Sequence, residues 1–394
     1  MKKNEAWLLP QGIEEALPAE AAQLESLRRQ ILDMYASWGY QLVIPPTVDY
    51  LDSLLTGTGY DLDIQTFKLI DQLTGKSLGV RADMTPQVAR IDAHHLKAEI
   101  SRLCYIGTVL HTRPDGFAGS RSPIQVGAEL YGHAGIESDA EVIELMLKTL
   151  SMAGLEQVYL DLGHVGIYRS LAKQANLSKS LEAELFDMMQ RKALAEIKEF
   201  VAVQNLDDEI AQMLLKLPEL NGDEKVIDQA ITVLKAAADD VLQALDYLKQ
   251  VSRVLKARIG DINLNFDLAE LRGYHFHTGI VFTAFVPGQG QEVARGGRYD
   301  EIGEVFGRAR PATGFSTDLK TLIDLGSPAV VNSGNGILAA ADIDSELQQL
   351  IETLRAAGEC VIQLLPGQQS DASAMNCNRI IQKTNNKWHV VEAK

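Results

Sequence analysis

The stretch LCYIGTVLHTRPDGFAGSRSPIQVGAELYG, residues 103–132, has two segments rich in β-branched and aromatic residues on either side of a Gly/Pro/Ser-rich loop. Such a pattern predicts a β-hairpin. The loop carries Arg113 and Arg121, and the second strand carries Gln125 and Glu129. Because side chains on a strand alternate between its two faces, Gln125 and Glu129 point to the same face. The hairpin is therefore predicted to hold a small ligand such as a nucleotide or an amino acid.

Helical and strand patterns continue on both sides of this hairpin. Apolar spacing and boundary residues predict helices, and β-rich runs predict strands. Outward from the hairpin they predict helices over 19–38, 86–97 and 139–152, a strand over 40–50 and a second hairpin over 67–83. Thr85 and Pro86 are expected to supply the N-cap and the first helical position of the helix over 86–97.

Residues 166–257 are rich in Leu, Ala, Glu, Lys and Gln with helical spacing, which predicts an all-helical insertion. Strand patterns return afterwards, over 262–268, 274–286 and 313–319. Strands on both sides of the insertion imply one mixed or antiparallel sheet completed by distant segments. The predicted fold class is α+β, an antiparallel sheet flanked by helices. Its predicted parts are a core over 1–165 and 258–325, the helical insertion over 166–257, and a small α/β domain over 326–394.

Composition limits the partners of the chain. Its 394 residues include 37 Lys and Arg against 53 Asp and Glu, a formal net charge of -16, which disfavours nucleic-acid binding. The N-terminus lacks a secretory apolar segment and no run of about 18 apolar residues occurs, so we expect a cytoplasmic protein without membrane contact. Cys104, Cys360 and Cys377 are far apart and odd in number, which predicts reduced thiols.

No spacing of residues indicates a cofactor or a metal. TGKS at 74–77 lacks the first glycine of a P-loop, and GQGQEV at 288–293 lacks the third glycine of a dinucleotide fingerprint. His275 and His277 lie two apart on a predicted strand and so share a face, but no cysteine or third histidine is near them in sequence. We expect no cofactor and no metal, and a polar pocket wall at the two histidines.

Charged and polar side chains occupy strand positions where apolar ones are expected. They are Asp83, Thr85, Gln125, Glu129 and Arg272. Carboxylates and an amide can accept hydrogen bonds from an ammonium group and an imidazole N–H, and an arginine can bind a carboxylate through two hydrogen bonds. Those are the groups of a free amino acid. The pattern alone is equally compatible with scattered surface charges on half-exposed strands.

Four segments carry a resemblance to a known family. They are, in order, RADMTPQ (81–87), RLCYIGTVLHTRPDGFAGSRSPIQVGAELYG (102–132), LRGYHFHTGIVF (271–282) and ARGGRYDEIGEVFG (294–307). Together they resemble the histidyl-tRNA synthetase family of class II aminoacyl-tRNA synthetases. GYQLVIPPTVDY at 39–50 is similar to its dimer-forming motif 1. The similarity covers residues 1–325 and implies a class II synthetase-like fold.

The resemblance implies that the polar strand residues form a histidine pocket. By position, the implied histidine-binding residues are Asp83, Thr85, Arg113, Gln125, Glu129, Arg272, Tyr274 and His277. Arg272 takes the place of the arginine that opens the second histidine motif of the family. His277 stands where the synthetases usually have a tyrosine, so the contact there is altered but still polar.

Two departures from the synthetases concern ATP. In motif 2 an ungapped alignment places His111 where the synthetases bind the α-phosphate with an arginine, and Arg113 where an acidic residue follows. At the end of motif 3, Lys320 and Thr321 replace a Glu-Arg pair. Each lost arginine would remove ~3 kcal/mol of transition-state stabilisation. The resemblance therefore implies that amino-acid activation is nearly abolished, unless Arg113 substitutes from a shifted position.

A histidine pocket without ATP chemistry, followed by a tail shorter than the anticodon-binding domain of the synthetases, resembles the regulatory subunits of ATP phosphoribosyltransferase. This resemblance implies a non-catalytic subunit in histidine biosynthesis that pairs with a short-form catalytic subunit and forms a homodimer through motif 1. It also implies allosteric feedback inhibition by histidine. The alternatives are a divergent histidyl-tRNA synthetase or related amino-acid-activating ligase, and a paralogue that binds another amino acid.

Overall fold

The structure is a computed structural model that describes residues 8–55, 60–114, 119–271, 273–274, 276–327 and 336–393. Internal contacts divide the chain into two compact units, Met1–Pro328 and Ala329–Lys394, and each is described by itself. No helix in these described ranges is both long and apolar enough to cross a membrane.

The core of the first unit combines helices with two sheets. Its helices are α1 (Pro18–Ser37), α2 (Leu51–Leu55), α3 (Tyr60–Gln65), α4 (Thr85–His95), α5 (Ile136–Met152) and α12 (Leu319–Leu325). Its strands are β1 (Gln41–Leu42), β2 (Val48–Tyr50), β3 (Phe67–Ile70), β4 (Ser77–Val80), β5 (Ser101–Thr108), β6 (Ile124–Tyr131), β7 (Tyr159–His164), β9 (Asn263–Asp267), β10 (Ile280–Phe285), β11 (Ala294–Arg298) and β12 (Ala312–Asp318). A short 3-10 helix, η2, spans Glu304–Phe306.

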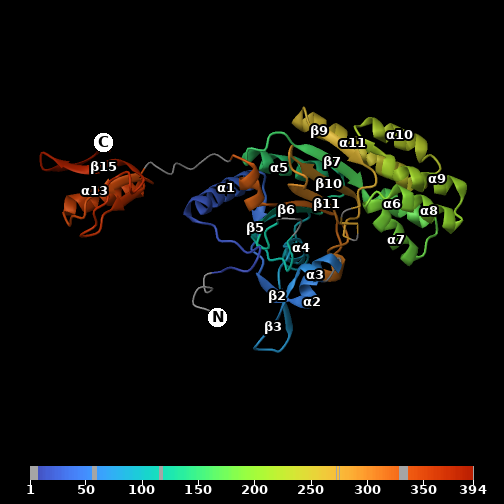
Figure 1. Cartoon of the computed structure of the whole chain (residues 1–394), viewed down its shortest axis with the longest axis horizontal. Coiled ribbons are helices and arrows are strands. Elements are labelled where there is room, and N and C mark those ends of the chain that lie inside the picture. Colours follow the sequence, from blue (N-terminus) through green and yellow to red (C-terminus); the bar gives the residue numbers. More distant parts are fainter. Residues whose placement is uncertain are drawn as a thin grey trace. The chain divides into compact units, whose positions relative to one another are not determined.

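The large sheet has nine strands in the order β1-β5-β6-β12-β11-β10-β7-β9-β8, where β8 is Asn221–Gly222 of the insertion. Its neighbours are antiparallel except β1 with β5 and β7 with β9. The hairpin predicted over 103–132 is confirmed as β5 and β6, with Leu103 opposite Glu129. Strand β12, from the far side of the insertion, lies between β6 and β11, so distant segments complete one sheet as predicted (Figure 1).

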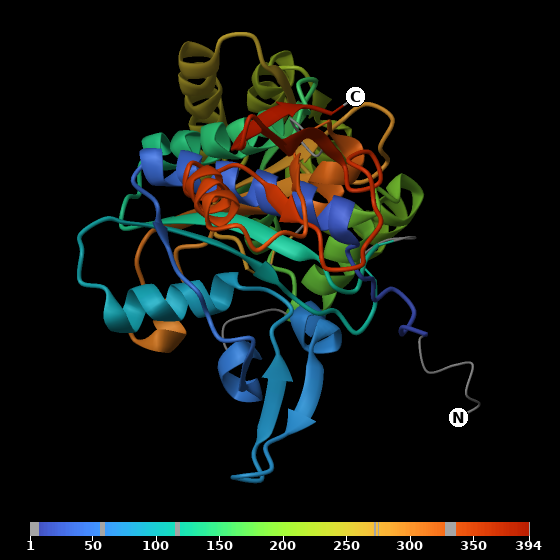
Figure 2. The same ribbon diagram turned by 90° about the vertical axis from the view of Figure 1, so that its left-hand side faces the viewer.

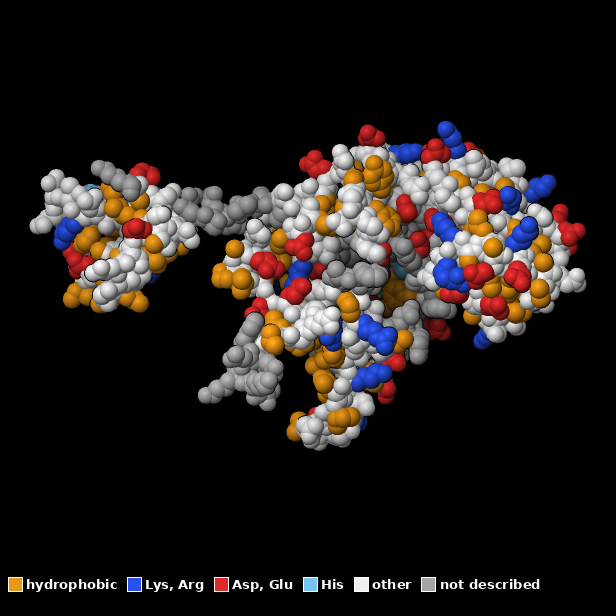
Figure 3. Space-filling model, in the orientation of Figure 1, with side chains coloured by type: hydrophobic (Ala, Val, Ile, Leu, Met, Phe, Trp, Pro, Cys, Tyr) orange, Lys and Arg blue, Asp and Glu red, His pale blue; other side chains and the backbone are white. Residues whose placement is uncertain are grey.

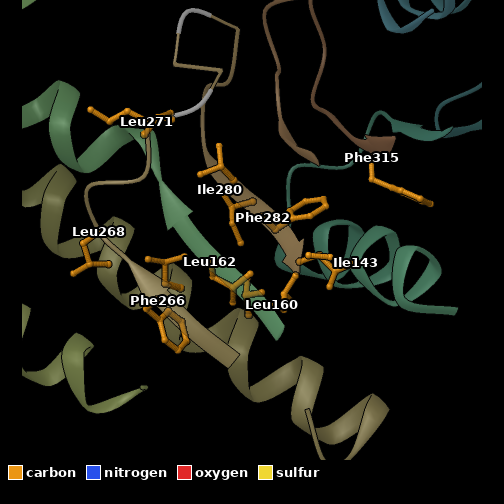
Figure 4. Close-up of a cluster of buried hydrophobic side chains, with 14 of the residues drawn as sticks. Ile143, Leu160, Leu162, Phe266, Leu268, Leu271, Ile280, Phe282 and Phe315 are labelled. Atoms are coloured by element: carbon orange, nitrogen blue, oxygen red, sulfur yellow. The ribbon is translucent and has the colours of Figure 1, made fainter. Parts of the chain in front are cut away.

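The main hydrophobic core lies between one face of this sheet and the helices that cover it. Leu160 and Leu162 of β7, Phe282 of β10 and Ile143 of α5 are all fully buried in it. Figure 4 shows these side chains converging between the strands and α5, together with Phe266 of β9. Burying one such side chain stabilises the fold by roughly 1.5–3 kcal/mol.

The opposite face of the sheet carries a smaller cluster beneath α4. Leu103 and Tyr105 of β5 belong to it, whereas the residue between them, Cys104, points into the main core. Met84 and Val88, at the start of α4, complete the contact. This second face therefore combines apolar packing with the polar strand residues singled out above.

The insertion consists of α6 (Val165–Gln174), α7 (Lys179–Gln190), α8 (Leu194–Gln204), α9 (Asp208–Lys216), η1 (Leu217–Glu219), α10 (Lys225–Val233) and α11 (Asp239–Ile259). It is not entirely helical as predicted, because β8 (Asn221–Gly222) pairs with β9 and adds an edge strand to the large sheet. Tyr247 of α11 donates a hydrogen bond to buried Asp139 of α5, whose carboxylate also pairs with Arg298 at 3.0 Å. This polar contact ties the insertion to the core.

The predicted strand over 40–50 is wrong in one respect, because it is split into β1 and β2. Pro45 and Pro46 lie between the two and have no N–H to donate to a ladder. Strand β1 extends the large sheet beside β5, and β2 joins β4 and β3 in a separate three-stranded sheet. The hairpin β3–β4 is confirmed and projects away from the large sheet (Figure 2).

The second unit is a four-stranded sheet with one helix. Its elements are β13 (Gly336–Ala339), α13 (Ser345–Ala356), β14 (Val361–Gln363), β15 (Cys377–Thr384) and β16 (Lys387–Glu392), with the strands in the order β14-β13-β15-β16. Ile337, Leu347, Ile351 and Ile381 form its small core between helix and sheet. Both helix and strands agree with the α/β pattern expected after residue 326.

Candidate functional site: a buried carboxyl group on β6

Glu129 lies at the centre of the polar residues that the sequence singles out. It is on the face of β6 next to α4 and is 1% exposed. Its Oε1 accepts hydrogen bonds from the hydroxyl groups of Tyr105 at 2.9 Å and Thr85 at 3.2 Å. Its Oε2 accepts one from the hydroxyl of Tyr299. Three hydroxyl groups therefore orient this carboxyl, and no Lys or Arg of the described ranges forms an ion pair with it.

Burial dominates the electrostatics of this carboxyl group. Loss of contact with water raises the pKa of Glu129 well above its ordinary value, and the negative charge of Asp83 acts in the same direction. The hydroxyl groups of Tyr105 and Thr85 lower the pKa but do not offset burial. A carboxyl group in this state gains from the approach of a cation, because the cation stabilises its ionised form.

Glycines on the neighbouring strands leave room beside Glu129. Gly314 of β12 is opposite Glu129, and Gly297 of β11 is opposite Gly314, so all three share one face. A Cβ at Gly314 would overlap Oε2 of Glu129, and a Cβ at Gly297 would lie 2.5 Å from Cδ2 of His277. The surface of the sheet between Glu129 and His277 is therefore formed by backbone at Gly314 and Gly297, and we call it the backbone floor.

Asp83 and Gln125 are brought together as the sequence predicted. The Nε2 of Gln125 donates to Oδ1 of Asp83 at 2.8 Å, and Oε1 of Gln125 accepts from the Met84 N–H at 2.9 Å. Gln125 and Glu129 lie on the same strand, β6, with the spacing expected of a shared face. The amide of Gln125 thus holds the Asp83 carboxylate at the N-terminal end of α4.

Thr85 has a different local role from the predicted one. The N-cap position of α4 is Met84, whose side chain makes no capping hydrogen bond, and Oδ1 of Asp83 accepts the N–H of Thr85, the first helical residue, at 2.9 Å. The hydroxyl of Thr85 contacts Tyr105 at 3.1 Å and donates to Glu129 instead. The hydroxyl that the sequence pattern assigned to helix capping is therefore part of the polar site, and Thr85 is itself the first helical residue, so Pro86 stands second in α4, one position later than predicted.

His277 lies next to this site, in a loop rather than on a strand as predicted. Strand β10 begins only at Ile280. The His277 ring is 6.5 Å from the Tyr299 ring and 5.4 Å from the Phe276 ring, and Phe276 packs on Tyr299 at 4.9 Å. The loop thus places an imidazole and an aromatic ring beside the tyrosine that donates to Glu129.

Tyr274 is not brought into this group. Its ring packs against Tyr168 and Phe186 of the insertion, and its hydroxyl donates to Glu182 at 2.7 Å. These aromatic partners hold the side chain toward α6 and α7, and its part in histidine binding stays a prediction. Arg113 is exposed in the loop after β5. The remaining predicted residues, Arg272 and His275, lie outside the described ranges.

The positions that depart from the synthetases make structural contacts. His111 Nε2 is 2.9 Å from the carbonyl oxygen of Ala82, a contact with the backbone at the end of the β3–β4 hairpin. The Thr321 hydroxyl donates at 2.9 Å to Asp318, the residue that caps α12. Lys320 reaches Glu14 at 3.7 Å. In the described ranges, no group of His, Cys, Asp and Glu side chains has the arrangement of a metal site.

Three parts of the site were missed by sequence reasoning. Tyr105 and Tyr299 donate to Glu129, and Gly314 makes room for it. Tyr105 stands in the apolar run LCYI of β5, so its hydroxyl gives no separate signal. Only the strand register brings Gly314 opposite Glu129. Gly314 could have been recognised as a neighbour of Glu129 only if the pairing of β6 with β12 had been known.

Comparison with known proteins places these features in a family. A model of histidyl-tRNA synthetase matches residues 12–322, and a model of the C-terminal domain of the ATP phosphoribosyltransferase subunit HisZ matches residues 334–391. The ATP phosphoribosyltransferase regulatory subunit of Thioalkalivibrio sulfidiphilus is 57% identical over 394 residues, which is 100% of both chains. That of Pseudomonas syringae pv. syringae is 54% identical over 99% of both chains.

Solved structures support the same placement of the fold. A crystal structure described as an ATP phosphoribosyltransferase regulatory subunit/histidyl-tRNA synthetase from Bacillus halodurans aligns with a TM-score of 0.83 at 27% identity, over 94% of this chain and 96% of that one. Histidyl-tRNA synthetase from Nostoc sp. PCC 7120 has the same fold, with a TM-score of 0.76 at 16% identity over 98% and 97% of the chains. The class II synthetase-like fold is thereby confirmed. The chain belongs to the family of ATP phosphoribosyltransferase regulatory subunits.

Proposed function

We propose that this chain binds free histidine at Glu129 and thereby regulates a short-form catalytic ATP phosphoribosyltransferase subunit. As a member of the regulatory family it is non-catalytic, and the catalytic activity is carried by the other subunit. The observation that carries the histidine proposal is the buried carboxyl group of Glu129, with its raised pKa and no ion-pair partner among the described residues. The α-ammonium group or the imidazolium of histidine supplies the missing cation.

The groups around Glu129 suit the rest of a histidine molecule. Asp83, held by Gln125, offers a second carboxylate for a ring N–H or an ammonium hydrogen. His277 and Phe276 offer ring edges and faces for a flat heterocycle. Arg272 is the proposed partner of the histidine carboxylate, on the basis of the sequence resemblance alone.

Regulation follows if histidine distinguishes two arrangements of the complex. A ligand shifts an equilibrium only by the difference in its affinity for the two states. We propose that histidine binds the inhibited arrangement more tightly than the active one. Bound histidine therefore shifts the complex toward the inhibited arrangement, and by linkage the inhibited arrangement has the higher histidine affinity. The pathway step is the first of histidine biosynthesis, as the sequence resemblance implies.

We further propose that two copies associate through the motif 1 segment and the three-stranded sheet. Several large apolar side chains are exposed there: Val48, Tyr50 and Leu69 share one face of the sheet, and Ile44, which is 82% exposed, precedes β2. Apolar side chains clustered in this way indicate a protein interface. A second copy of the chain is the proposed occupant, and binding of nucleic acid is not proposed because acidic and basic side chains are interspersed over the face seen in Figure 3.

One experiment tests the regulatory proposal directly. The full chain is co-expressed with a tagged short-form catalytic subunit, and the complex is purified and assayed with and without histidine. Co-purification, activation and inhibition by histidine are the expected results, and the Glu129→Gln complex should remain active but insensitive to histidine. Histidine-dependent ATP–pyrophosphate exchange by the isolated chain would favour the ligase alternative instead. Absence of histidine binding in calorimetry would refute the histidine proposal in either setting.

A further inference from the structure

A groove between the insertion and the core is lined by polar side chains that the histidine pocket does not use. Helix α6 lines one wall, helix α11 the other, and the two helices pack side by side (Figure 1). His164 at the end of β7 and Thr278 of the loop before β10 contribute from the core. The cavity volume is about 410 Å³, which is within the range of small-molecule sites.

Each helix turns one face toward the groove. The lining residues of α6 include Arg169 and Lys173, four apart, and those of α11 include Asp240 and Tyr247, seven apart. Residues at such spacings lie on the same side of a helix. The groove is therefore a built feature of two facing helices.

The charged groups of the groove are unbalanced and not neutralised internally. Lys173 and Asp240 form no ion pair within the described ranges of the chain. Arg169 uses Nη2 to donate to the carbonyl oxygens of Tyr274 and His277, both at 3.1 Å. Its side chain also hydrogen-bonds the side chain of Tyr274. Two cations therefore face one carboxylate in the groove.

His164 adds a neutral donor to the groove. Its Nδ1 accepts the Gly166 N–H at 3.1 Å, so the proton of the neutral ring is on Nε2. Burial lowers the pKa of His164 to about 4, and the charges of Arg169 and Arg298 act in the same direction. The ring is therefore neutral at physiological pH and offers an N–H to a ligand without adding charge.

Arg169 connects the groove to the loop that carries His277 beside the histidine pocket. Its two hydrogen bonds hold the backbone of that loop at Tyr274 and His277, and its guanidinium lies 4.9 Å from the centre of the Tyr274 ring. An anion that draws the guanidinium of Arg169 into the groove would weaken these bonds. Since His277 borders the space beside Glu129, the loop would then present a different wall to an amino acid.

We propose that this groove binds a small phosphate-bearing molecule and that Arg169 transmits its binding to the loop that carries His277. Arginine and lysine are the side chains that bind phosphate oxygens most strongly, through charge-assisted hydrogen bonds. The transmission, unlike the binding itself, rests on the proposed histidine function. By linkage, a change in histidine affinity caused by the anion equals the change in anion affinity caused by histidine.

The first experiment measures binding of pyrophosphate and of inorganic phosphate to the full chain by calorimetry. Lys173→Ala is expected to weaken binding about fivefold, the upper value for an exposed charge pair, and Asp240→Asn to strengthen it. Lys198→Ala, which removes an exposed lysine of α8, is the matched control and should leave affinity unchanged. Absence of saturable binding at millimolar concentration, or equal effects of the Lys173 and Lys198 variants, would overturn the site. Equal binding of malonate would show a site for carboxylates instead of phosphates.

The second experiment measures histidine affinity with and without saturating pyrophosphate. A change in the wild-type protein that disappears in Arg169→Lys, which keeps the charge but not the forked geometry, supports the transmission. Unchanged histidine affinity in wild-type protein with bound pyrophosphate overturns it. If histidine fails to bind at all, the proposed function fails, while the first experiment still decides whether the groove binds phosphate.

Discussion

Replacement of Glu129 by glutamine separates its charge from its shape. The carboxyl is 1% exposed and accepts hydrogen bonds from three hydroxyl groups, two of them at 2.9 and 3.2 Å. An amide of the same size keeps Oε1 as an acceptor for Tyr105 and Thr85, and the Tyr299 hydroxyl can rotate to accept from Nε2. The variant should therefore fold with the site intact but without its ionisable group.

Glu129→Gln should weaken histidine binding but stabilise the ligand-free protein. Loss of a charge-assisted hydrogen bond of about 1.5–3 kcal/mol should weaken histidine binding roughly 10- to 150-fold. The ligand-free protein should become more stable at neutral pH, by about 1–3 kcal/mol, because an ionised carboxyl no longer has to be buried. Glu129→Ala should instead lose both binding and at least ~2 kcal/mol of stability, since it leaves three buried hydroxyl groups without their acceptor.

The pH dependence gives the sharpest test. Because the folded-state pKa of Glu129 is raised, the folded protein binds more protons than the unfolded chain, and its contribution to stability falls as pH rises from the ordinary glutamate value through the raised one. Histidine affinity should change in the opposite direction and rise over the same range, because only the ionised carboxylate attracts a cation. Glutamine at this position should remove both trends.

Calorimetry over a pH series and thermal unfolding without ligand provide the measurements. Glu199→Gln, at an exposed position of α8, is the matched control for loss of one negative charge. Wild-type histidine affinity in Glu129→Gln, or a lower unfolding midpoint than wild type at neutral pH, would refute the assignment of Glu129 as the cation-binding group.

Three further outcomes are expected. Arg298→Met should lower the free energy of unfolding by about 3–5 kcal/mol in denaturant titrations, because Asp139 is left charged and buried, and exposed Arg295→Met should cost far less. Leu69→Asp should shift a dimer to monomer in light scattering without lowering the unfolding midpoint, and an unchanged mass would exclude this surface as the interface. Gly314→Ala should abolish histidine binding and cost about 1–3 kcal/mol of stability, since its methyl group overlaps Glu129. A normal histidine affinity in calorimetry would contradict the assignment of Gly314 to the surface beside Glu129.

Much of the fold could be predicted because local patterns and tertiary structure agree there. The hairpin over 103–132 combines alternating strands with an obvious loop, and both appear as β5 and β6. The strand over 40–50 failed because its composition is β-rich while Pro45 and Pro46 interrupt the ladder. The edge strand at Asn221–Gly222 has too few residues to leave a periodic signal among helices.

The site was predictable where residues follow one another on a single strand. Gln125 and Glu129 share a face by the two-residue period of β6, whatever the partner strands are. Thr85 was assigned to capping because Thr before Pro is typical of a helix start, but a buried carboxyl competes successfully for its hydroxyl. The packing of Tyr274 against the insertion could not be predicted, because its aromatic partners are distant in sequence and no local pattern shows which way a loop side chain turns.

The backbone floor of the pocket limits how its ligand preference can change. Gly314 and Gly297 already have the smallest side chain, and any larger residue at either position would displace Glu129 or His277 from the site. Adaptation to another effector, in evolution or by design, must therefore act on the wall formed by Phe276 and His277. A variant library confined to these two positions would sample most of the accessible changes in ligand size.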